Sequence, residues 1–291
     1  MRKMVPSYYD QFRCTASGCR HNCCIGWEID IDEKTEKRYL NYSCDDAEFL
    51  RKLKGSIAWP DRRDRRNGVP ASFILSEKER CPFLTDENLC EIYQKMGKEA
   101  LCQICTDHPR FRNFYKKHVE EGLGLCCEEA ARIILSAPEA PVYYYTDDTP
   151  AVPEYQKCID PSVIRRLSSR ELSTRDWAEV LLSLERLDES WTELLLDLES
   201  CAECPVVPEF LEEEWVQRFE RLKEYLLYRH FMEMGRDFVE TVWNLLIRIC
   251  EAEAVKKGSF SFEDMVEVAR LYSGEIEYSD ENTDAIMNEL E

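Results

Sequence analysis

The sequence predicts a mainly α-helical protein whose N-terminal part is a cysteine-rich α+β unit with short strands and hairpins. Eleven of the 15 cysteines fall in residues 1–135. This first part carries 23 Lys and Arg against 22 Asp and Glu, whereas residues 136–291 carry 15 against 36. The second part also repeats apolar residues at the three- and four-residue spacing of amphipathic helices. We therefore expect an acidic multi-helix unit behind the cysteine-rich one.

The first part contains signals for short helices and strands. Residues 27–32 alternate apolar and acidic side chains, as a half-buried strand does, and Asp32 is placed to cap a helix over residues 33–41. A second helix is expected over residues 45–54. The arginine-rich stretch 59–68 contains turn residues and is expected to be an exposed, solvated loop, although its arginines could meet an acidic or phosphate group.

A small knuckle is predicted where turn residues separate two apolar ends. Residues 86–88 supply the turn, and the knuckle would bring Cys81 and Cys90 together. Further elements are expected as strands over residues 71–75, 111–119 and 122–126, and as helices over residues 92–97 and 128–136.

A proline-rich segment, residues 137–153, is expected to link the two units. This boundary places the cysteine-rich unit in residues 1–136 and the acidic helical unit in residues 154–291. In the second unit, Ser173 to Asp176 forms a plausible helix start, and Gly258 marks a turn. Long helices are expected over residues 177–198, 210–231, 236–257 and 261–272.

The composition narrows the classes of function. The net charge of −20 argues against nucleic acid as the main partner and suits a basic or lysine-bearing protein surface better, although acidic residues that only maintain solubility explain the charge at least as well. The N-terminus lacks the apolar core of a signal peptide, and no stretch reaches the roughly 18 apolar residues of a membrane-spanning helix. We therefore place the chain in the cytoplasm, where 15 cysteines favour metal binding or catalysis over disulfides. The sequence leaves the oligomeric state open.

The cysteines are spaced like ligands of a metal or iron–sulfur site. Thiolates from separate short segments converge on such a centre, and soft thiolates suit zinc and iron–sulfur clusters equally. Adjacent cysteines, about 3.8 Å apart at Cα, form a disulfide only with strain, so each adjacent pair offers one ligand or serves two centres. The candidates fall into four groups: Cys14, Cys19, Cys23 and Cys24; Cys81 and Cys90; Cys102 and Cys105; and Cys126 and Cys127.

The other cysteines and the histidines are weaker candidates for metal ligands. The segment Cys201–Cys204 has the spacing of a ligand or redox pair, but nothing nearby in the sequence completes it. His21 and His108 lie inside the cysteine segments and could ligate metal, although a turn is favoured for His108. His118 and His230 have no neighbours of these types. Three cysteines that stand alone in helical segments are expected to act as small hydrophobes: Cys44, Cys158 and Cys250.

These segments resemble the flagellin lysine N-methylase family. The opening signature is matched by Cys14-Thr-Ala-Ser-Gly-Cys19 and Cys23-Cys24-Ile-Gly-Trp27, and the middle by Cys81-Pro-Phe-Leu, Leu89-Cys90-Glu-Ile and Cys105 before Pro109-Arg110. The stretch Cys127-Glu-Glu-Ala-Ala-Arg132 looks like the family's Cys-Pro-Glu-Ala-Ala-Arg, with Glu128 in place of proline. Near the end, Tyr228-Arg-His-Phe and Glu275-Ile-Glu-Tyr-Ser-Asp-Glu-Asn282 are also similar. His108 departs from the tyrosine that the family tends to show.

The resemblance implies a cytoplasmic protein-lysine N-methyltransferase that transfers methyl groups from S-adenosylmethionine to lysine side chains of flagellin. It also implies a cysteine-bound [4Fe-4S] cluster, with zinc as an alternative or second metal. Eight thiols exceed the four that one such cluster needs, so a second metal, packing or redox roles stay open. The implied metal ligands are Cys14, Cys19, Cys23, Cys24, Cys81, Cys90, Cys105 and Cys127.

A second interpretation is a non-catalytic zinc- or iron-binding protein that stores metal or scaffolds a partner. It stays open because the sequence contains no recognisable S-adenosylmethionine-binding fold. The catalytic base, the S-adenosylmethionine site and the choice between polar and radical methyl transfer are not identified by the sequence.

Overall fold

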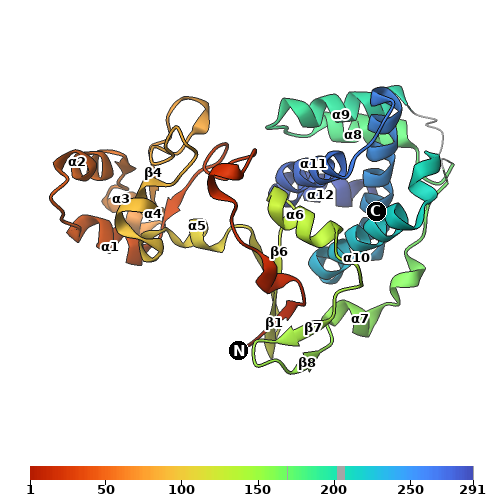
Figure 1. The fold of residues 1–291 in the computed structure, drawn as a ribbon, viewed down its shortest axis with the longest axis horizontal. Helices are drawn as coiled ribbons and strands as arrows, with labels where there is room; N and C mark the ends of the chain where they lie inside the picture. The colour runs from red at the N-terminus through yellow and green to blue at the C-terminus, as the bar shows by residue number, and fades with distance from the viewer. Residues whose placement is uncertain (169, 202–206, 291) are drawn as a thin grey trace. The chain divides into compact units, whose positions relative to one another are not determined.

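The chain folds into two compact units, and the sequence of one interrupts the sequence of the other. The computed structural model describes residues 1–168, 170–201 and 207–290. One unit consists of Met1–Arg13 together with Pro109–Glu291, and the second consists of Cys14–His108 (Figure 1). The division therefore differs from the predicted boundary at residues 137–153. The difference arises because the N-terminal strand and residues 109–153 pair in one sheet.

The sheet of the first unit has the strand order β5-β6-β1-β7-β8. Strand β1 (Arg2–Pro6) lies in its middle, parallel to β6 (His118–Leu123) and antiparallel to β7 (Tyr143–Tyr145). The predicted linker thus contributes β7 and also β8 (Pro150–Ala151) to the sheet. Strands were expected over residues 111–119 and 122–126, but β5 (Arg110–Phe114) ends earlier and pairs antiparallel with β6, so the turn lies at residues 115–117 and not at 120–121.

Helices make up most of the rest of this unit, which confirms the mainly α fold (Figure 1). The predicted helices over 210–231 and 236–257 are confirmed as the two parts of α10 (Glu213–Lys257). They meet at Gly235, whose φ of 81° breaks the helix. The other helices are α6 (Glu128–Leu135), α7 (Glu154–Cys158), α8 (Thr174–Ser183), α9 (Glu189–Ser200), α11 (Phe262–Tyr272) and α12 (Asp280–Leu290).

One predicted helix is divided in two. Instead of a continuous helix over 177–198, α8 ends at Ser183 and α9 begins after Asp188. The Asp188 side chain accepts a hydrogen bond from the Ser190 amide, and the buried carboxylate of Glu275 accepts from the amides of Leu187 and Asp188 at 2.7–3.2 Å. A carboxylate distant in the sequence therefore satisfies the amides at the start of α9.

The core of this first unit forms where the helices pack on one another and on the sheet. Trp191 of α9, Tyr225 of α10 and Phe238 of α10 are almost fully buried, as is Met4 of β1. The N-terminal strand is thus part of the helical unit's core and not of the cysteine-rich unit.

The cysteine-rich unit has its own sheet and core. Strands β2 (Asp30–Ile31), β4 (Ala71–Phe73) and β3 (Ile57–Ala58) are antiparallel in that order. As predicted, Asp32 caps the helix α1 (Glu33–Asn41), accepting a 3.0 Å hydrogen bond from the Thr35 amide. The aromatic core of the cysteine-rich unit contains Phe49, Phe73 and Phe83. The helices are α1 (Glu33–Asn41), α2 (Ala47–Gly55), α3 (Arg62–Arg66), α4 (Glu91–Met96) and α5 (Gln103–Asp107).

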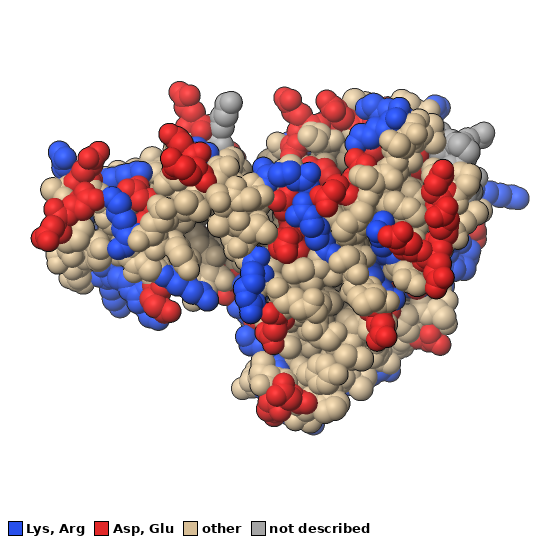
Figure 2. Space-filling model, in the orientation of Figure 1, with Lys and Arg blue, Asp and Glu red and all other residues tan. Residues whose placement is uncertain are grey.

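Charge follows the observed division of the chain. Residues 14–108 carry 15 Lys and Arg against 17 Asp and Glu, so most of the negative charge belongs to the first unit. Figure 2 shows acidic side chains spread over this first unit with basic side chains between them. Within the described part of the chain, no helix combines the length and the apolar character needed to cross a bilayer.

The buried position of Met4 predicts a large effect of a small change. Met4→Ala should lower the free energy of unfolding by about 3 kcal/mol, because it leaves a cavity in the centre of the sheet. The matched control is Met1→Ala, since Met1 is 80% exposed and its truncation should change stability by less than about 0.5 kcal/mol. Urea unfolding followed by tryptophan fluorescence measures both. Equal effects of the two variants would contradict the central placement of β1.

Candidate functional site

Six cysteines of the cysteine-rich unit lie close enough for the ionisation of one to affect another. The thiol pKa of Cys24 responds to Cys23, Cys81 and Cys90, and that of Cys105 responds to Cys102 and Cys23. Four separate segments of the chain therefore converge. We call this set the thiol group: Cys23, Cys24, Cys81, Cys90, Cys102 and Cys105.

Backbone hydrogen bonds position these segments. The amide of Cys81 donates to the carbonyl of Cys24 at 2.8 Å, which joins the opening cysteines to the knuckle. The predicted knuckle is confirmed: Leu84 and Cys90 form an antiparallel bridge, and Asn88 takes the left-handed conformation of the turn with a φ of 57°.

The last pair of the thiol group lies at α5. Cys102 precedes α5 and Cys105 is in its first turn. The hydroxyl of Tyr39 is 3.6 Å from Cys102 Sγ and donates to the carbonyl of Ala100 at 2.6 Å. The buried Tyr39 therefore holds the segment that leads into α5. Cys102, which the family pattern does not require, is as closely involved as the predicted ligands.

The pKa values of the thiol group reflect crowding and burial. A hydrogen bond from the Cys24 thiol lowers the pKa of Cys23, and the same contact together with burial raises the pKa of Cys24. A hydrogen bond with Cys102, followed by burial, raises the pKa of Cys105. Burial raises the pKa of Cys81 to about 12. Burial thus favours the thiol form of Cys24, Cys81, Cys90 and Cys105, whereas Cys23 is shifted towards the thiolate.

The remaining predicted ligands have other surroundings. Cys14 Sγ accepts a hydrogen bond from the Ala16 amide at 3.4 Å, and Cys19 donates to the carbonyl of His21 at 3.1 Å. Cys127 precedes α6 and belongs to the other unit. Among the described residues, no three His, Cys, Asp or Glu side chains are arranged as a set that could hold a metal ion. The eight-cysteine assignment therefore stays a prediction.

The cysteines outside the predicted ligand set differ in their burial. Cys250 is buried in the helical core, as expected of a small hydrophobe, whereas Cys44 is partly exposed and Cys158 is exposed. Cys204, the second member of the predicted pair with Cys201, lies outside the described residues. His108 packs edge-on against Trp27, with ring centroids 5.2 Å apart.

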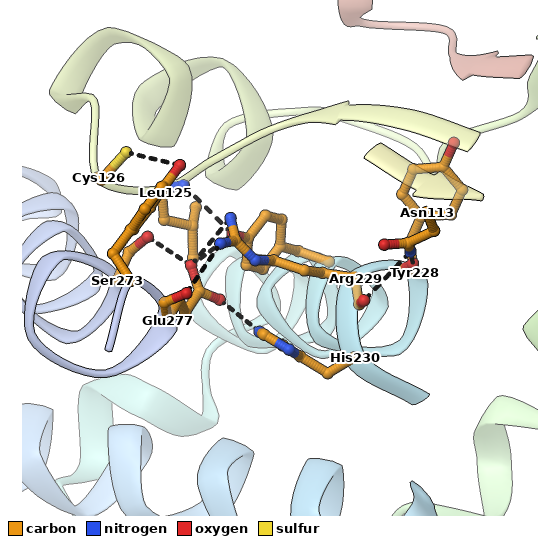
Figure 3. Close-up of polar contacts among 10 residues, drawn as sticks. Asn113, Leu125, Cys126, Tyr228, Arg229, His230, Ser273 and Glu277 are labelled. Carbon is orange, nitrogen blue, oxygen red and sulfur yellow. Dashed lines mark hydrogen bonds and ion pairs between the residues drawn. The ribbon is translucent and has the colours of Figure 1, made fainter. Parts of the chain in front are cut away.

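A second candidate site is built around Glu277 in the helical unit. Its carboxylate is fully buried and lies in a π-helical turn, Ser273–Glu277, between α11 and α12. Arg229 Nη1 is 3.3 Å from Glu277 Oε2, and His230 Nε2 is 2.8 Å from Oε1. Figure 3 shows Arg229 and His230 reaching from α10 towards Glu277, with Ser273 on the same side as the carboxylate. We call these residues, with Tyr225, the Glu277 network.

Every oxygen of the Glu277 carboxylate has a donor. Tyr225 donates to Oε2 at 2.7 Å and Ser273 also donates to it. Burial alone would raise the pKa of Glu277, but Arg229, His230 and Ser273 lower it to about 2. Burial lowers the pKa of His230, so the imidazole is neutral near pH 7 and donates to the carboxylate. The network therefore holds one buried Arg–Glu ion pair with its hydrogen bonds satisfied.

The Glu277 network supports a surface residue, Tyr278. Tyr278 is 43% exposed, its ring lies 5.0 Å from the Arg229 guanidinium, and its hydroxyl is 3.4 Å from Cys126 Sγ. Gly124 makes this packing possible: a Cβ there would lie 2.9 Å from the Tyr278 hydroxyl and 3.1 Å from Arg229 Nη1. A side chain at this position would therefore displace Tyr278 or Arg229 from the observed packing.

The histidines of the helical unit correct one expectation. His118 and His230 were expected to have no companions, but both face carboxylates. His118 Nε2 is 3.4 Å from Glu120 Oε1 and 3.6 Å from Glu154 Oε1. Burial raises the pKa of Glu120 to about 7, and burial lowers the pKa of His118. Glu120 lies two residues after His118 on the same strand, so a strand predicted over residues 118–120 would have placed the two on one face. Glu154 and Glu277 are distant in the sequence, and nothing near the histidines indicates them.

Comparisons with known proteins agree with the motifs. A flagellar biosynthetic protein, FliU, of Salmonella muenchen is 31% identical over 135 residues, which are 46% of this chain and 78% of that protein. The chain belongs to the flagellin lysine N-methylase family. Lysine-N-methylases of Salmonella typhimurium and Salmonella choleraesuis are also 31% identical over 135 residues. The match spans only a third of the length of each of these two relatives. No family model and no solved structure matches the chain.

The Glu277 network is of interest because it joins two stretches of the sequence that resemble the family. The two late stretches that resemble the family are Tyr228–Phe231 and Glu275–Asn282, and they meet in the folded chain through Arg229, His230 and Glu277. The sequence contained one local signal: Arg229 follows Tyr225 and Leu226, two buried residues, by one helical turn. A charged residue next to buried residues on a helix requires a buried partner.

The low pKa of Glu277 predicts a pH-dependent stability. Because its pKa falls from 4.5 to about 2 on folding, the carboxylate stabilises the fold above about pH 4.5, and this contribution is lost as the pH falls towards 2. Glu277→Gln should lower the free energy of unfolding by about 3 kcal/mol at pH 7. The difference from the parent chain should shrink below pH 4.5 when urea unfolding is measured across this range.

The control for this prediction is the exposed Glu281, which lies four residues further along the chain. Glu281→Gln should leave the free energy of unfolding within about 0.5 kcal/mol of the parent at every pH. A difference between Glu277→Gln and the parent chain that stays constant from pH 7 to pH 3 would contradict the assigned ion pair.

Proposed function

We propose that this protein is an S-adenosylmethionine-dependent protein-lysine N-methyltransferase that acts on flagellin. The observation that carries the proposal is family membership: relatives named lysine-N-methylase and FliU share 31% identity over 135 residues with this chain. Support also comes from the fold, since two stretches that resemble the family meet at the Glu277 network.

The chemistry sets what the protein must do. In the polar route, the lysine Nζ lone pair attacks the methyl carbon of the sulfonium, an N–C bond forms, and the S–C bond breaks to leave a neutral thioether. The ammonium form of lysine has no lone pair, so its proton must pass to an acceptor before the attack. Burial and nearby groups that lower the lysine pKa promote this step.

We further propose that the cysteine-rich unit holds the [4Fe-4S] cluster implied by the family. The thiol group fits the chemistry of such a centre, because soft sulfur donors converge from four separate segments. When bound, a cluster supplies electron transfer or an open iron coordination position. The chain's own contribution is to hold the thiols within its separate aromatic core, around Phe49, Phe73 and Phe83.

In this proposal the Glu277 network positions groups at the surface of the helical unit. Arg229 is tied to Glu277 on one side and packs under the ring of Tyr278 on the other. The network can thereby hold Tyr278 and the adjoining Cys126 in one arrangement without taking part in bond changes itself. Arg229 and Glu277 are therefore positioning residues.

Methyl transfer can be measured directly. The full chain, purified without oxygen, is incubated with S-adenosylmethionine labelled in its methyl group and with flagellin. The label should appear on lysine side chains of flagellin, as identified by mass spectrometry of its peptides. Flagellin with acetylated lysines is the control, because an amide nitrogen is a poor nucleophile. No transfer to unmodified flagellin by a chain that contains its full complement of iron would refute the enzyme assignment.

The metal content tests the thiol group. Cys81 is central to this group, so Cys81→Ser should reduce bound iron per chain by at least about half and weaken visible absorption of the cluster. Cys250→Ser is the matched control, because Cys250 is also a buried thiol but lies in the helical core. Parent protein that holds only zinc would refute the iron–sulfur proposal and favour the non-catalytic zinc-binding alternative. An equal loss of iron in both variants would refute the assignment of Cys81.

A further inference from the structure

An arginine-rich helix stands on the surface of the cysteine-rich unit. The connection between β3 and β4 was expected to be a loop, but it contains α3 (Arg62–Arg66). Four of the five residues of α3 are arginines, and all four are exposed. The connection therefore has a folded structure whose side chains point into solvent.

The backbone of this connection is fixed at both ends. The Asp61 side chain accepts hydrogen bonds from the amides of Arg63 and Asp64 at 2.6 and 2.9 Å. At the other end, Gly68 takes a φ of 83°, and the Val69 amide donates to the carbonyl of Asp64 at 3.0 Å. The arginines are thus presented by an ordered turn of helix, which reduces the entropy lost when a partner binds.

Among the described residues, one of the four guanidinium groups of α3 is paired with a carboxylate. Arg65 Nη2 is 2.7 Å from Glu36 Oε1, which joins α3 to α1. Within the described part of the chain, Arg62, Arg63 and Arg66 form no ion pair with a carboxylate; Arg66 Nε donates to the carbonyl of Arg62. Like charges three and four residues apart destabilise a helix slightly. The three arginines therefore weaken the element that carries them and are available to bind a partner.

We propose that Arg62, Arg63 and Arg66 form a docking surface for an acidic segment of the protein substrate. Arginine suits this role because its planar guanidinium binds a carboxylate through two parallel hydrogen bonds. Trp59 and Val69, at the two ends of the connection, are 38% and 48% exposed and add apolar contact area. We call these three arginines, together with Trp59 and Val69, the arginine surface. This inference rests on the proposed function for the identity of the partner, but not for the chemistry of the contact.

Protein carboxylates are favoured over nucleic-acid phosphates by the charge of the chain. Residues 14–108 carry more acidic than basic residues, and the whole chain has a net charge of −20. A long polyanion would be repelled by this field beyond the few arginines that it touches. A short acidic segment can bind these arginines locally and leave the neighbouring acidic residues in solvent.

Binding can be measured without any methyl transfer. The probe is a short, fluorescein-labelled glutamate-rich peptide that carries one lysine, and its anisotropy is followed on addition of the full chain at about 50 and 200 mM salt. The triple variant R62A/R63A/R66A should bind the peptide about tenfold more weakly at the lower salt concentration. The affinity of the parent chain should fall between the two salt concentrations.

The matched control removes the same charge from the same unit. R51A/K54A/K98A replaces three exposed basic residues outside α3 and should change peptide affinity by less than about twofold. Neither variant should unfold at a lower temperature than the parent chain, because none of the six side chains is buried. An equal loss of affinity in the two triple variants would overturn the proposal, since net charge alone would then explain the binding.

Two further measurements separate this proposal from its alternatives. In the flagellin assay, R62A/R63A/R66A should raise KM about tenfold with an unchanged kcat, as expected when a docking contact is lost. An unchanged KM with active enzyme would overturn the docking role and leave the methyltransferase assignment intact. A parent chain that binds the peptide but does not methylate flagellin would refute the methyltransferase assignment and leave the docking role intact. Tighter binding of a single-stranded RNA than of the peptide, lost in the same variant, would overturn the choice of partner.

Discussion

The pairing of β1 with β6 and β7 is the interaction on which the helical unit depends. It brings residues 2–6 back to residues 118–123 after the chain has formed a complete second unit. Polar contacts reinforce it: Tyr228 of α10 donates to the carbonyls of Met4 and Glu121 at 3.4 Å. Because β1 lies between two other strands, its loss would leave amides and carbonyls of both neighbours unpaired within the unit.

The sequence predicts elements whose signals are local. Asp32 and the capping box of Ser261 and Asp264 place the starts of α1 and α11, and the interval expected between the helices over 210–231 and 236–257 contains the break in α10. The contacts that set the unit boundary are different in kind. The segment 137–153 looks like a linker because of its prolines, and only its pairing with a strand more than 130 residues away makes it part of a sheet. No local pattern reports such a pairing.

The two candidate sites were predictable to different degrees. Thiol chemistry and spacing identify the cysteine segments, and the knuckle that joins Cys81 to Cys90 follows from its turn residues. The sequence cannot say which thiols come close, because their approach depends on backbone contacts such as that between Cys24 and Cys81. The Glu277 network depends still more on tertiary structure. Its arginine and glutamate are 48 residues apart in the sequence. They form an ion pair only because the fold buries both side chains next to each other.

The insertion of one unit into the other also fixes an order of events during synthesis. Residues 14–108 contain a whole sheet, a whole aromatic core and the entire thiol group, so this unit can fold as soon as it leaves the ribosome. Strand β1 is made first, yet it has no partner until β6 has been translated. The thiol group can therefore come together while β1 still lacks its partner strand β6.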